Sequence, residues 1–276
     1  MTATVRQWTL TTGVALLVIA LTGSSMINSF FNRMTFQPGP GVHADAASLG
    51  VPLEEVTIRT EDDVRLHGFY LPRPEASRAV LFLHGNAGNA TDRLPLAKGI
   101  AALGASVLLP DYRGYGFSEG KPDEPGLYLD ARAALRYLVE ERGYPADRII
   151  VMGRSLGGAA AIHLVAEQPV AGLVLIATPQ SARAMARSMG LGLFAPLAGR
   201  RLDSEGKIPG IAAPILMFHG DRDEIVPVAQ GEALFAVAPE PKTLQLIRGA
   251  QHNDIIDVAG GQFWQPLARF IAEVTP

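Results

Sequence analysis

The chain of 276 residues contains no cysteine. Catalysis by a thiol, stabilisation by a disulfide and binding of zinc through thiolates are therefore all excluded. Charge is also scarce, because charged residues make up 18% of the chain and the formal net charge is −3, which gives no reason to expect nucleic acid as a partner. Hydrophobic residues make up 48%, so the composition and length are those of one large globular domain with a short appendage.

The N-terminal segment has a long stretch without charge. No charged residue lies between Arg6 and Arg33, and residues 14–21 are strongly apolar. Such a segment can cross the roughly 30 Å hydrocarbon layer of a bilayer as a helix. A cleaved signal peptide, whose apolar region spans about 7–15 residues, is the alternative. We expect residues 1–35 to be a single-pass membrane anchor with residues 36–276 on the extracytoplasmic side, or a signal segment of a secreted or periplasmic protein.

Short apolar runs recur along the chain after the Pro-Gly linker at 38–41. Several are apolar throughout, which is typical of strands covered on both faces by helices. The predicted strands are Val56–Thr60, Leu66–Leu71, Ala79–Leu83, Ser106–Leu109, Ile149–Met152, Leu173–Ile176, Ile215–Phe218 and Thr243–Ile247. The predicted helices are Asp92–Leu103, Leu127–Arg142, Leu156–Glu167, Val228–Val237 and Gly261–Val274. This order predicts an α/β fold with an eight-stranded, mostly parallel sheet that is entered through an antiparallel hairpin and has helices on both faces.

One connection is too long for a simple loop. It covers about residues 178–213, and two short helices are predicted in it, at Ser181–Met189 and Leu191–Leu197. Such an insertion overhangs the carboxyl edge of the sheet, where ligands bind in open α/β folds. We expect a short lid whose Met185 and Phe194 contact substrate; an ordinary surface excursion with its own small core is the alternative.

A G-x-S-x-G motif, Gly153-Arg154-Ser155-Leu156-Gly157, lies between a predicted strand and a predicted helix. At a strand-to-helix turn this arrangement exposes a serine hydroxyl as a nucleophile, and the glycines allow the turn to be sharp. Ser155 is therefore the candidate nucleophile.

A serine hydroxyl is a weak nucleophile until an adjacent base takes its proton. His252 is the best candidate among six histidines, because it lies in a polar loop after the last predicted strand. His43 and His67 are expected far from the carboxyl edge, and His163 is expected to point along its helix, away from the active site. His84 and His219 are near the edge, where we expect them to shape loops through hydrogen bonds to backbone.

The base in turn needs a carboxylate, and two aspartates follow the seventh predicted strand. Asp221 comes directly after the strand, where an aspartate commonly binds turn amides. Asp223 lies further into the loop and can reach the loop after the next strand, so we choose it. The order Ser155, Asp223, His252 along the chain is the one expected for the α/β-hydrolase fold.

Two loops at the same edge complete the candidate site. The backbone N–H of Leu156 and that of Asn86, after the third predicted strand, are the expected oxyanion-hole donors. In the loop after the fourth strand, Tyr115 and Phe117 are candidate substrate contacts, and Asp111 and Arg113 are expected to form a structural ion pair. No P-loop or H-E-x-x-H motif is present, so neither a nucleotide nor a metal cofactor is required.

Five motifs together resemble the α/β-hydrolase superfamily and, within it, the membrane-anchored BEM46-like serine hydrolases. They are H-G-N-A-G-N at 84–89, D-Y-R-G-Y-G-x-S-x-G at 111–120, G-R-S-L-G-G at 153–158, H-G-D-R-D-x-x-V-P at 219–227 and G-A-Q-H-N-D at 249–254. The resemblance covers roughly residues 36–276 and implies hydrolysis of esters, thioesters or lipid esters. Some relatives attach to membranes through a palmitoylated N-terminal cysteine cluster, which this chain lacks.

The combined expectation is a serine hydrolase that cleaves carboxylic esters or thioesters through an acyl-enzyme. An apolar lid with Arg183, Arg187, Arg200 and Arg201 favours lipid or amphiphilic substrates. A peptidase similar to the S33 aminopeptidases is the first alternative, although acidic residues that would bind a peptide amino group are sparse in the lid. A non-catalytic, membrane-tethered scaffold is the second.

Overall fold

The computed structural model describes residues 27–39, 41 and 49–274. The chain divides into two compact units, residues 1–37 and 38–276. In the first unit residues 27–35 are helical. Most of the predicted anchor or signal segment, residues 1–26, lies outside the described residues. Among the residues that are described, no helix is long and apolar enough to cross a membrane.

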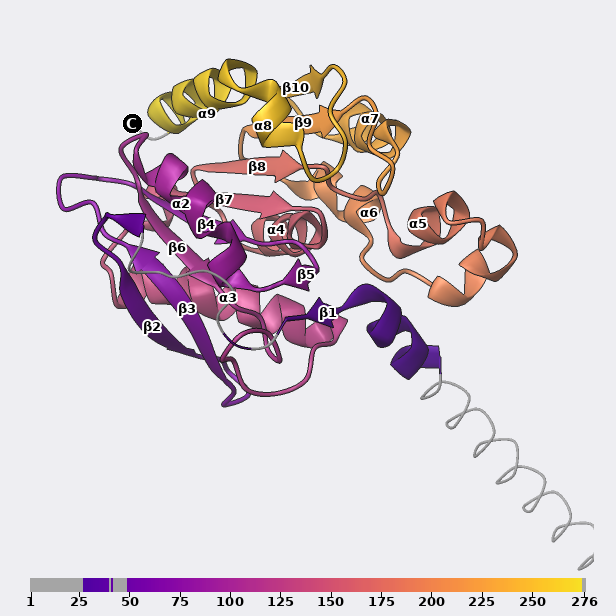
Figure 1. The fold of residues 1–276 in the computed structure, drawn as a ribbon, viewed down its shortest axis with the longest axis horizontal. Coiled ribbons are helices and arrows are strands. Elements are labelled where there is room, and N and C mark those ends of the chain that lie inside the picture. The colour runs from indigo at the N-terminus through magenta and orange to yellow at the C-terminus, as the bar shows by residue number, and fades with distance from the viewer. Residues whose placement is uncertain (1–26, 40, 42–48, 275–276) are drawn as a thin grey trace, which may run out of the picture. The chain divides into compact units, whose positions relative to one another are not determined.

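An eight-stranded sheet forms the centre of the second unit (Figure 1). The strand order is β10-β9-β8-β7-β4-β6-β3-β2. β2 and β3 form an antiparallel hairpin and β3 is antiparallel to β6, whereas the remaining neighbours are parallel. The strands are β2 (Glu54–Arg59), β3 (Arg65–Leu71), β4 (Ala79–Leu83), β6 (Ser106–Pro110), β7 (Ile149–Arg154), β8 (Gly172–Ile176), β9 (Ile215–Gly220) and β10 (Lys242–Ile247). The predicted mostly parallel sheet with an antiparallel entry is confirmed.

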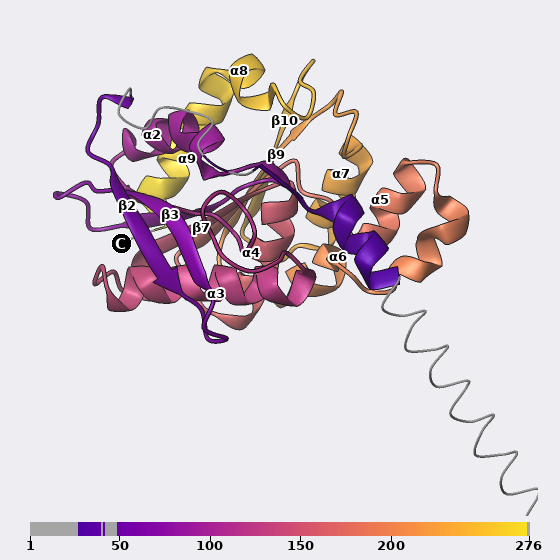
Figure 2. The ribbon, with the colours of Figure 1, turned by 60° about the horizontal axis from the view of Figure 1, so that its bottom comes forward.

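Helices cover both faces of this sheet (Figure 2). They are α2 (Leu94–Ala101), α3 (Glu124–Glu140), α4 (Leu156–Glu167), α5 (Ala182–Ser188), α6 (Ser204–Lys207), α7 (Val228–Val237), α8 (Ile255–Ala259) and α9 (Gly261–Glu273). Short 3-10 helices span Ala90–Arg93, Ala146–Arg148, Gly192–Ala198 and Ile208–Gly210, and the two-residue strands β1 (Gln37–Pro38) and β5 (Ala87–Gly88) lie outside the main sheet. α2, α8 and α9 pack on one face, and α3 and α4 pack on the other.

The central strands are apolar because both of their faces are covered. Every residue of β4 is buried, and its side chains alternate, so that Val80 and Phe82 face α2 and α9. Burial of a side chain of this size stabilises the fold by about 1.5–3 kcal/mol. The parallel strands therefore hold their carboxyl ends in register, and the loops that follow them meet at one edge.

The predicted ion pair between Asp111 and Arg113 is wrong. The Arg113 guanidinium donates instead to Asp130 of α3, at 2.9 Å from Nε to Oδ1, and to Asp62 of the β2–β3 turn, at 2.8 Å from Nη1 to Oδ2. Asp111 turns away and accepts a hydrogen bond from the backbone N–H of Ala90 at 2.7 Å. Arg113 thus joins three segments that are distant in sequence.

This arrangement predicts unequal losses of stability when either partner of Arg113 is removed. Asp130 is buried, so Asp130→Ala leaves part of a buried charge uncompensated; we expect a loss of about 2–3 kcal/mol of unfolding free energy. The Asp62 side chain is 41% exposed, and Asp62→Ala is the matched control, with an expected loss of about 0.5–1 kcal/mol. Urea unfolding of the two variants measures the difference. Equal losses of unfolding free energy would show that burial of the pair between Arg113 and Asp130 does not determine its contribution to stability.

Candidate active site

Ser155 occupies the single residue between the end of β7 and the start of α4. Its backbone has φ 52° and ψ −118°, in the left-handed half of conformational space that few residues other than glycine adopt. The turn is also crowded, because a Cβ atom at Gly157 would collide with the carbonyl oxygens of Leu83 and His84. The local sequence therefore folds into a strained elbow that lifts the serine side chain to the carboxyl edge of the sheet.

The structure brings Ser155, His252 and Asp223 into one hydrogen-bond chain. Ser155 Oγ lies 3.1 Å from His252 Nε2, and His252 Nδ1 lies 2.8 Å from Asp223 Oδ2. Because the carboxylate can only accept, Nδ1 carries the proton and Nε2 is left to accept from the serine hydroxyl. This is the arrangement in which a histidine removes the proton of a serine nucleophile.

Asp223 is held as an anion by its own loop. Its Oδ1 atom accepts hydrogen bonds from the backbone N–H groups of Ile225, at 3.0 Å, and Val226, at 2.7 Å. Burial raises the pKa of the carboxyl group, but hydrogen bonds from His219 and His252 outweigh it and hold the pKa well below its usual range. Asp221 has the structural role expected of it, since its Oδ1 accepts the Gly249 N–H at 2.6 Å.

The other described histidines behave largely as predicted. His84 and His219 shape loops, through contacts of 2.7 Å to the Gly85 carbonyl and 2.8 Å to the Val226 carbonyl. His163 stacks on Tyr128 of α3. His67 was expected far from the carboxyl edge, and this is wrong: β3 runs antiparallel to β6, so that the first residues of β3 lie beside Asp111 at the end of β6.

One expected oxyanion donor, Leu156, follows the nucleophile in the chain, and the other, Asn86, lies in the loop that packs against the nucleophile at Gly85. Leu156 is the first residue of α4, and the first N–H groups of a helix have no acceptor within the helix. The loop after β4 closes against the elbow, because a Cβ atom at Gly85 would lie 3.6 Å from the Cβ of Ser155. The hydroxyl of Tyr115 donates to the carbonyl of Asn86 at 2.8 Å.

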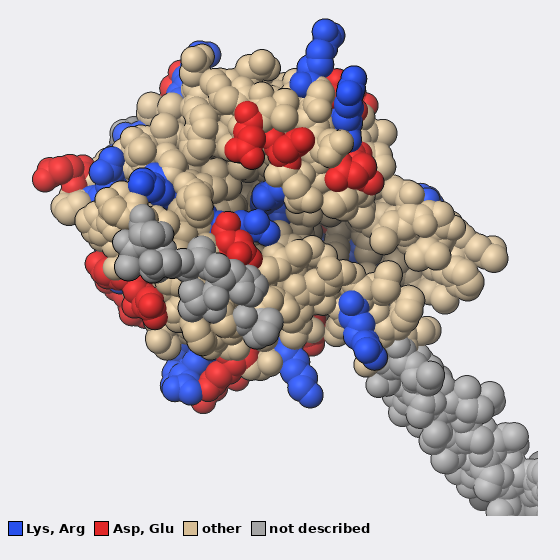
Figure 3. All heavy atoms as spheres, in the orientation of Figure 1, with Lys and Arg blue, Asp and Glu red and all other residues tan. Residues whose placement is uncertain are grey.

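The predicted substrate contacts fall into two groups. Tyr115 is fully buried, so it does not line the surface, and its hydroxyl serves the loop after β4 instead. Phe117 and Phe194 are 58% and 59% exposed, and Met185 of α5 is half-buried. Figure 3 shows that the surface is hollowed between the carboxyl ends of the central strands and the α5 segment. The exposed pair and Met185 remain predictions as substrate contacts.

Arg154 also contributes to the site, a role that was not predicted from the sequence. Its Nη2 atom donates to the carbonyl of His252 at 2.9 Å, and its side chain is buried. Burial lowers the pKa of the guanidinium to about 10. An arginine at the end of an otherwise apolar strand was the available signal. Arg154 thereby ties the strand that presents the serine to the loop that presents the base.

Comparisons with known proteins agree with the fold. A family model described as the alpha/beta hydrolase fold matches residues 78–203. The uncharacterized protein Rv2307c of Mycobacterium tuberculosis is 36% identical, over 93% of each chain, and protein bem46 of Schizosaccharomyces pombe is 34% identical, over 80% of this chain and 77% of that one. The chain belongs to the α/β-hydrolase fold family. Its resemblance to the Bem46 group is confirmed.

Solved α/β-hydrolase structures share the fold at low sequence identity. The Pyrococcus furiosus esterase Pf2001 superposes with a TM-score of 0.75 at 21% identity, over 88% of this chain and 99% of that one. An esterase domain from a Rhodothermus marinus protein gives a TM-score of 0.61 at 21% identity, over 80% and 100%. Identities this low establish the fold and not the substrate.

The geometry predicts different consequences for the two neighbouring aspartates. Asp223→Asn removes the acceptor that fixes the His252 tautomer, and we expect kcat for a short acyl ester to fall roughly 10³- to 10⁴-fold. Asp221→Asn, the matched control, should leave kcat close to that of the unaltered protein, because the side-chain oxygen of an asparagine can still accept the hydrogen bond from the Gly249 N–H. Steady-state kinetics of the two variants measure the difference in kcat. A larger loss for Asp221→Asn would show that the wrong carboxylate has been assigned.

Proposed function

We propose that this protein is a serine hydrolase that cleaves carboxylic ester or thioester bonds through an acyl-enzyme. The observation that carries the proposal is the chain of hydrogen bonds from Ser155 to His252, at 3.1 Å, and from His252 to Asp223, at 2.8 Å. Ser155 lies on the strained turn at the N-terminus of α4. The backbone N–H groups at a helix N-terminus can stabilise the oxyanion that develops during acyl transfer.

In the proposed reaction, Ser155 Oγ attacks the substrate carbonyl carbon and its proton passes to His252 Nε2. The backbone N–H groups of Asn86 and Leu156 donate to the oxyanion of the tetrahedral intermediate. Collapse of this intermediate breaks the bond to the leaving alcohol or thiol, which takes the proton from His252. Water then loses a proton to His252 and attacks the acyl carbon, so that the carboxylate product leaves and Ser155 recovers its proton.

The connection between β8 and β9 supports an amphiphilic or lipid acyl substrate. Large apolar side chains are exposed on this connection, among them Met189, Leu193 and Phe194. Figure 3 shows that the surface is hollowed beside the α5 segment of the connection. The N-terminal apolar segment, as a membrane anchor or a signal segment, is part of the same proposal and would place the enzyme at or beyond a membrane.

The alternatives have less support. A peptidase would need an acidic group to bind a peptide amino terminus, but Asp203 already accepts from Arg200, at 2.9 Å, and from the backbone N–H of Gly206, at 3.0 Å. A non-catalytic scaffold would not be expected to keep all three members of the hydrogen-bond chain at bonding distance.

A fluorophosphonate probe tests the proposal, because it phosphonylates activated serines. The purified protein should be labelled at Ser155 and should hydrolyse p-nitrophenyl esters, and Ser155→Ala should lose both. Ser77→Ala is the matched control, since Ser77 is exposed near the opposite edge of the sheet. Turnover that persists in Ser155→Ala would refute the nucleophile.

The same enzyme, assayed on a series of acyl chain lengths and on peptide amides, tests the substrate class. We expect kcat/KM to rise with acyl length, because each additional buried methylene contributes about 0.8 kcal/mol, and we expect no cleavage of the amides. A preference for amides would favour the peptidase.

A further inference from the structure

The segment between β8 and β9 exposes a compact apolar tip. Five large side chains are exposed within nine residues, led by Leu193 at 87%, and the others are Met189, Leu191, Phe194 and Leu197. The backbone beneath them is ordered by hydrogen bonds, such as Leu191 N–H to the Ala186 carbonyl at 2.8 Å, and Ala195 is buried under the tip. The exposure is therefore built into a folded element, and exposed patches of this kind mark interaction sites.

The charged residues of this segment are all basic from Gln180 to Leu202. No aspartate or glutamate lies between Gln180 and Leu202, a stretch that contains four arginines. Arg183 and Arg187 on α5 are exposed, and Arg200 pairs with Asp203 at the far end. A two-fold contact between copies of the chain would bring together two patches that both carry these arginines, and like charges repel. An anionic surface would instead attract them.

We propose that this tip inserts into the interface of an anionic phospholipid bilayer, with its apolar side chains among the acyl chains and Arg183 and Arg187 at the headgroups. The proposal rests on the surface alone and holds whether or not the protein hydrolyses esters. The segment follows the carboxyl end of β8, so the proposal brings the edge of the sheet that carries Ser155 toward the lipid.

The absence of cysteine allows a local test in the full-length chain. Leu193→Cys carries a unique environment-sensitive fluorophore at the tip, and Ser77→Cys carries the same label near the opposite edge. On vesicles of phosphatidylcholine mixed with phosphatidylglycerol, we expect the label at position 193 to brighten several-fold and shift to the blue, and the label at 77 to remain unchanged. The N-terminal segment cannot produce this difference, because it is the same in both proteins.

Three results would overturn the proposal. The first is no fluorescence response at position 193 although the protein floats with the vesicles, and the second is an equal response on phosphatidylcholine alone. The third is a response without vesicles that grows with protein concentration, which would show that a second copy of the chain covers the tip. Replacing Arg183 and Arg187 together by serine should raise the phosphatidylglycerol content needed for half the response.

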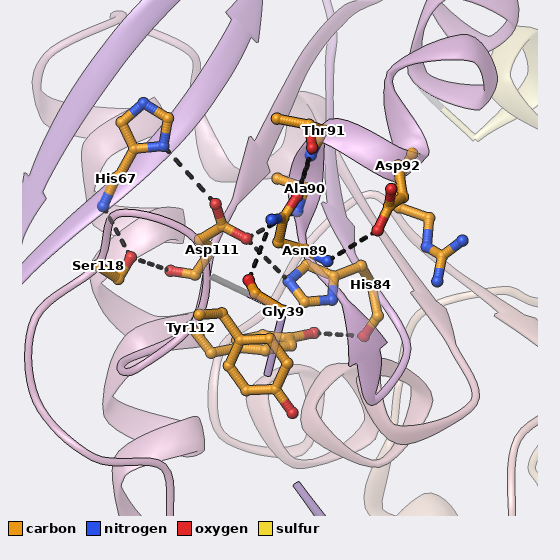
Figure 4. A network of polar contacts seen from close by, with 12 residues as sticks. Gly39, His67, His84, Asn89, Ala90, Thr91, Asp92, Asp111, Tyr112 and Ser118 are labelled. Atoms are coloured by element: carbon orange, nitrogen blue, oxygen red, sulfur yellow. Dashed lines mark hydrogen bonds and ion pairs between the residues drawn. The ribbon is translucent and has the colours of Figure 1, made fainter. Parts of the chain in front are cut away.

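A second, independent feature concerns the loop after β4. Three consecutive carbonyl groups of this loop, those of His84, Gly85 and Asn86, accept hydrogen bonds from aromatic side chains. Tyr112 Oη donates to the His84 carbonyl at 2.8 Å (Figure 4), His84 Nδ1 to the Gly85 carbonyl at 2.7 Å, and Tyr115 Oη to the Asn86 carbonyl at 2.8 Å.

The three rings form one buried group. His84 and Tyr115 are fully buried and Tyr112 is 1% exposed, and the ring centroids of Tyr112 and His84 are 4.4 Å apart. Burial raises the pKa of the Tyr112 hydroxyl well above its usual value, so it remains a donor at any physiological pH. Asp111 lies next to these rings. Its Oδ1 atom accepts a hydrogen bond from the Ala90 N–H at 2.7 Å and lies 3.5 Å from His84 Nε2.

In a trans peptide the C=O and N–H bonds point in opposite directions within one rigid plane. The Gly85 carbonyl and the Asn86 N–H belong to the same peptide, so the bond from His84 fixes the direction of that N–H. Tyr112 and Tyr115 fix the peptides on either side. We infer that Tyr112, His84 and Tyr115 are positioning residues that preorganise the Asn86 donor of the oxyanion hole; this inference rests on the proposed function.

Tyr115→Phe and Tyr112→Phe test it, because each removes one hydroxyl and keeps its ring. For a p-nitrophenyl ester we expect kcat to fall about tenfold or more with KM nearly unchanged, since the oxyanion forms only in the transition state. Affinity for a trifluoromethyl ketone, which forms a tetrahedral adduct with the serine, should fall by a similar factor. Tyr144→Phe is the matched control: it removes a 2.7 Å hydrogen bond to Ser106 at the opposite edge of the sheet.

The outcomes separate this inference from the proposed function. If the unaltered protein hydrolyses no ester and takes no fluorophosphonate, the proposed function fails. If it is active but Tyr115→Phe and Tyr112→Phe match Tyr144→Phe in kcat, the positioning role fails. A loss of stability with unchanged kcat in the folded fraction, determined by urea unfolding and active-site titration, would show that the hydroxyls serve the fold alone.

Discussion

The sharp turn between β7 and α4 is the constraint on which the other features of the site depend. It forces Ser155 into a backbone conformation that costs of order 1–3 kcal/mol, and it is maintained because the surrounding segments leave no room for another path. The loop after β4 closes against it at Gly85, and the carbonyl of Leu83 closes it at Gly157. One backbone turn therefore sets the position of the serine hydroxyl, the Leu156 amide and the Asn86 peptide together.

The remaining loops are held by hydrogen bonds between side chains and backbone groups. Arg154, at the last position of β7, donates to the carbonyl of His252, and Asp221 accepts from Gly249. Asp223 accepts from its own loop as well as from His252. His252 and Asp223, the proposed base and its carboxylate, are thus held by the fold before any substrate arrives. Preorganisation of this kind avoids the cost of reorienting dipoles during a reaction.

Much of the fold was predictable from the sequence, and so was the meeting of Ser155, Asp223 and His252 at one edge of the sheet. Strands buried on both faces must be apolar throughout, and the loops after parallel strands meet at one edge. His67 was misplaced because the reversed direction of β3 brings its start to that edge. The partners of Arg113 were missed because Asp62 and Asp130 are distant in sequence, and no local pattern reveals them. The role of Tyr115 depends on a carbonyl that only the folded loop presents.

The central claim is that Ser155 carries the acyl group during turnover. Rapid quenching of the enzyme with a p-nitrophenyl ester, followed by mass spectrometry of its peptides, tests it most directly. We predict a burst of p-nitrophenol that is stoichiometric with enzyme, and an acyl mass added to the peptide that contains Ser155. Ester turnover with the acyl group on another residue, or with no covalent intermediate when release of the acyl group is slowed, would contradict the account.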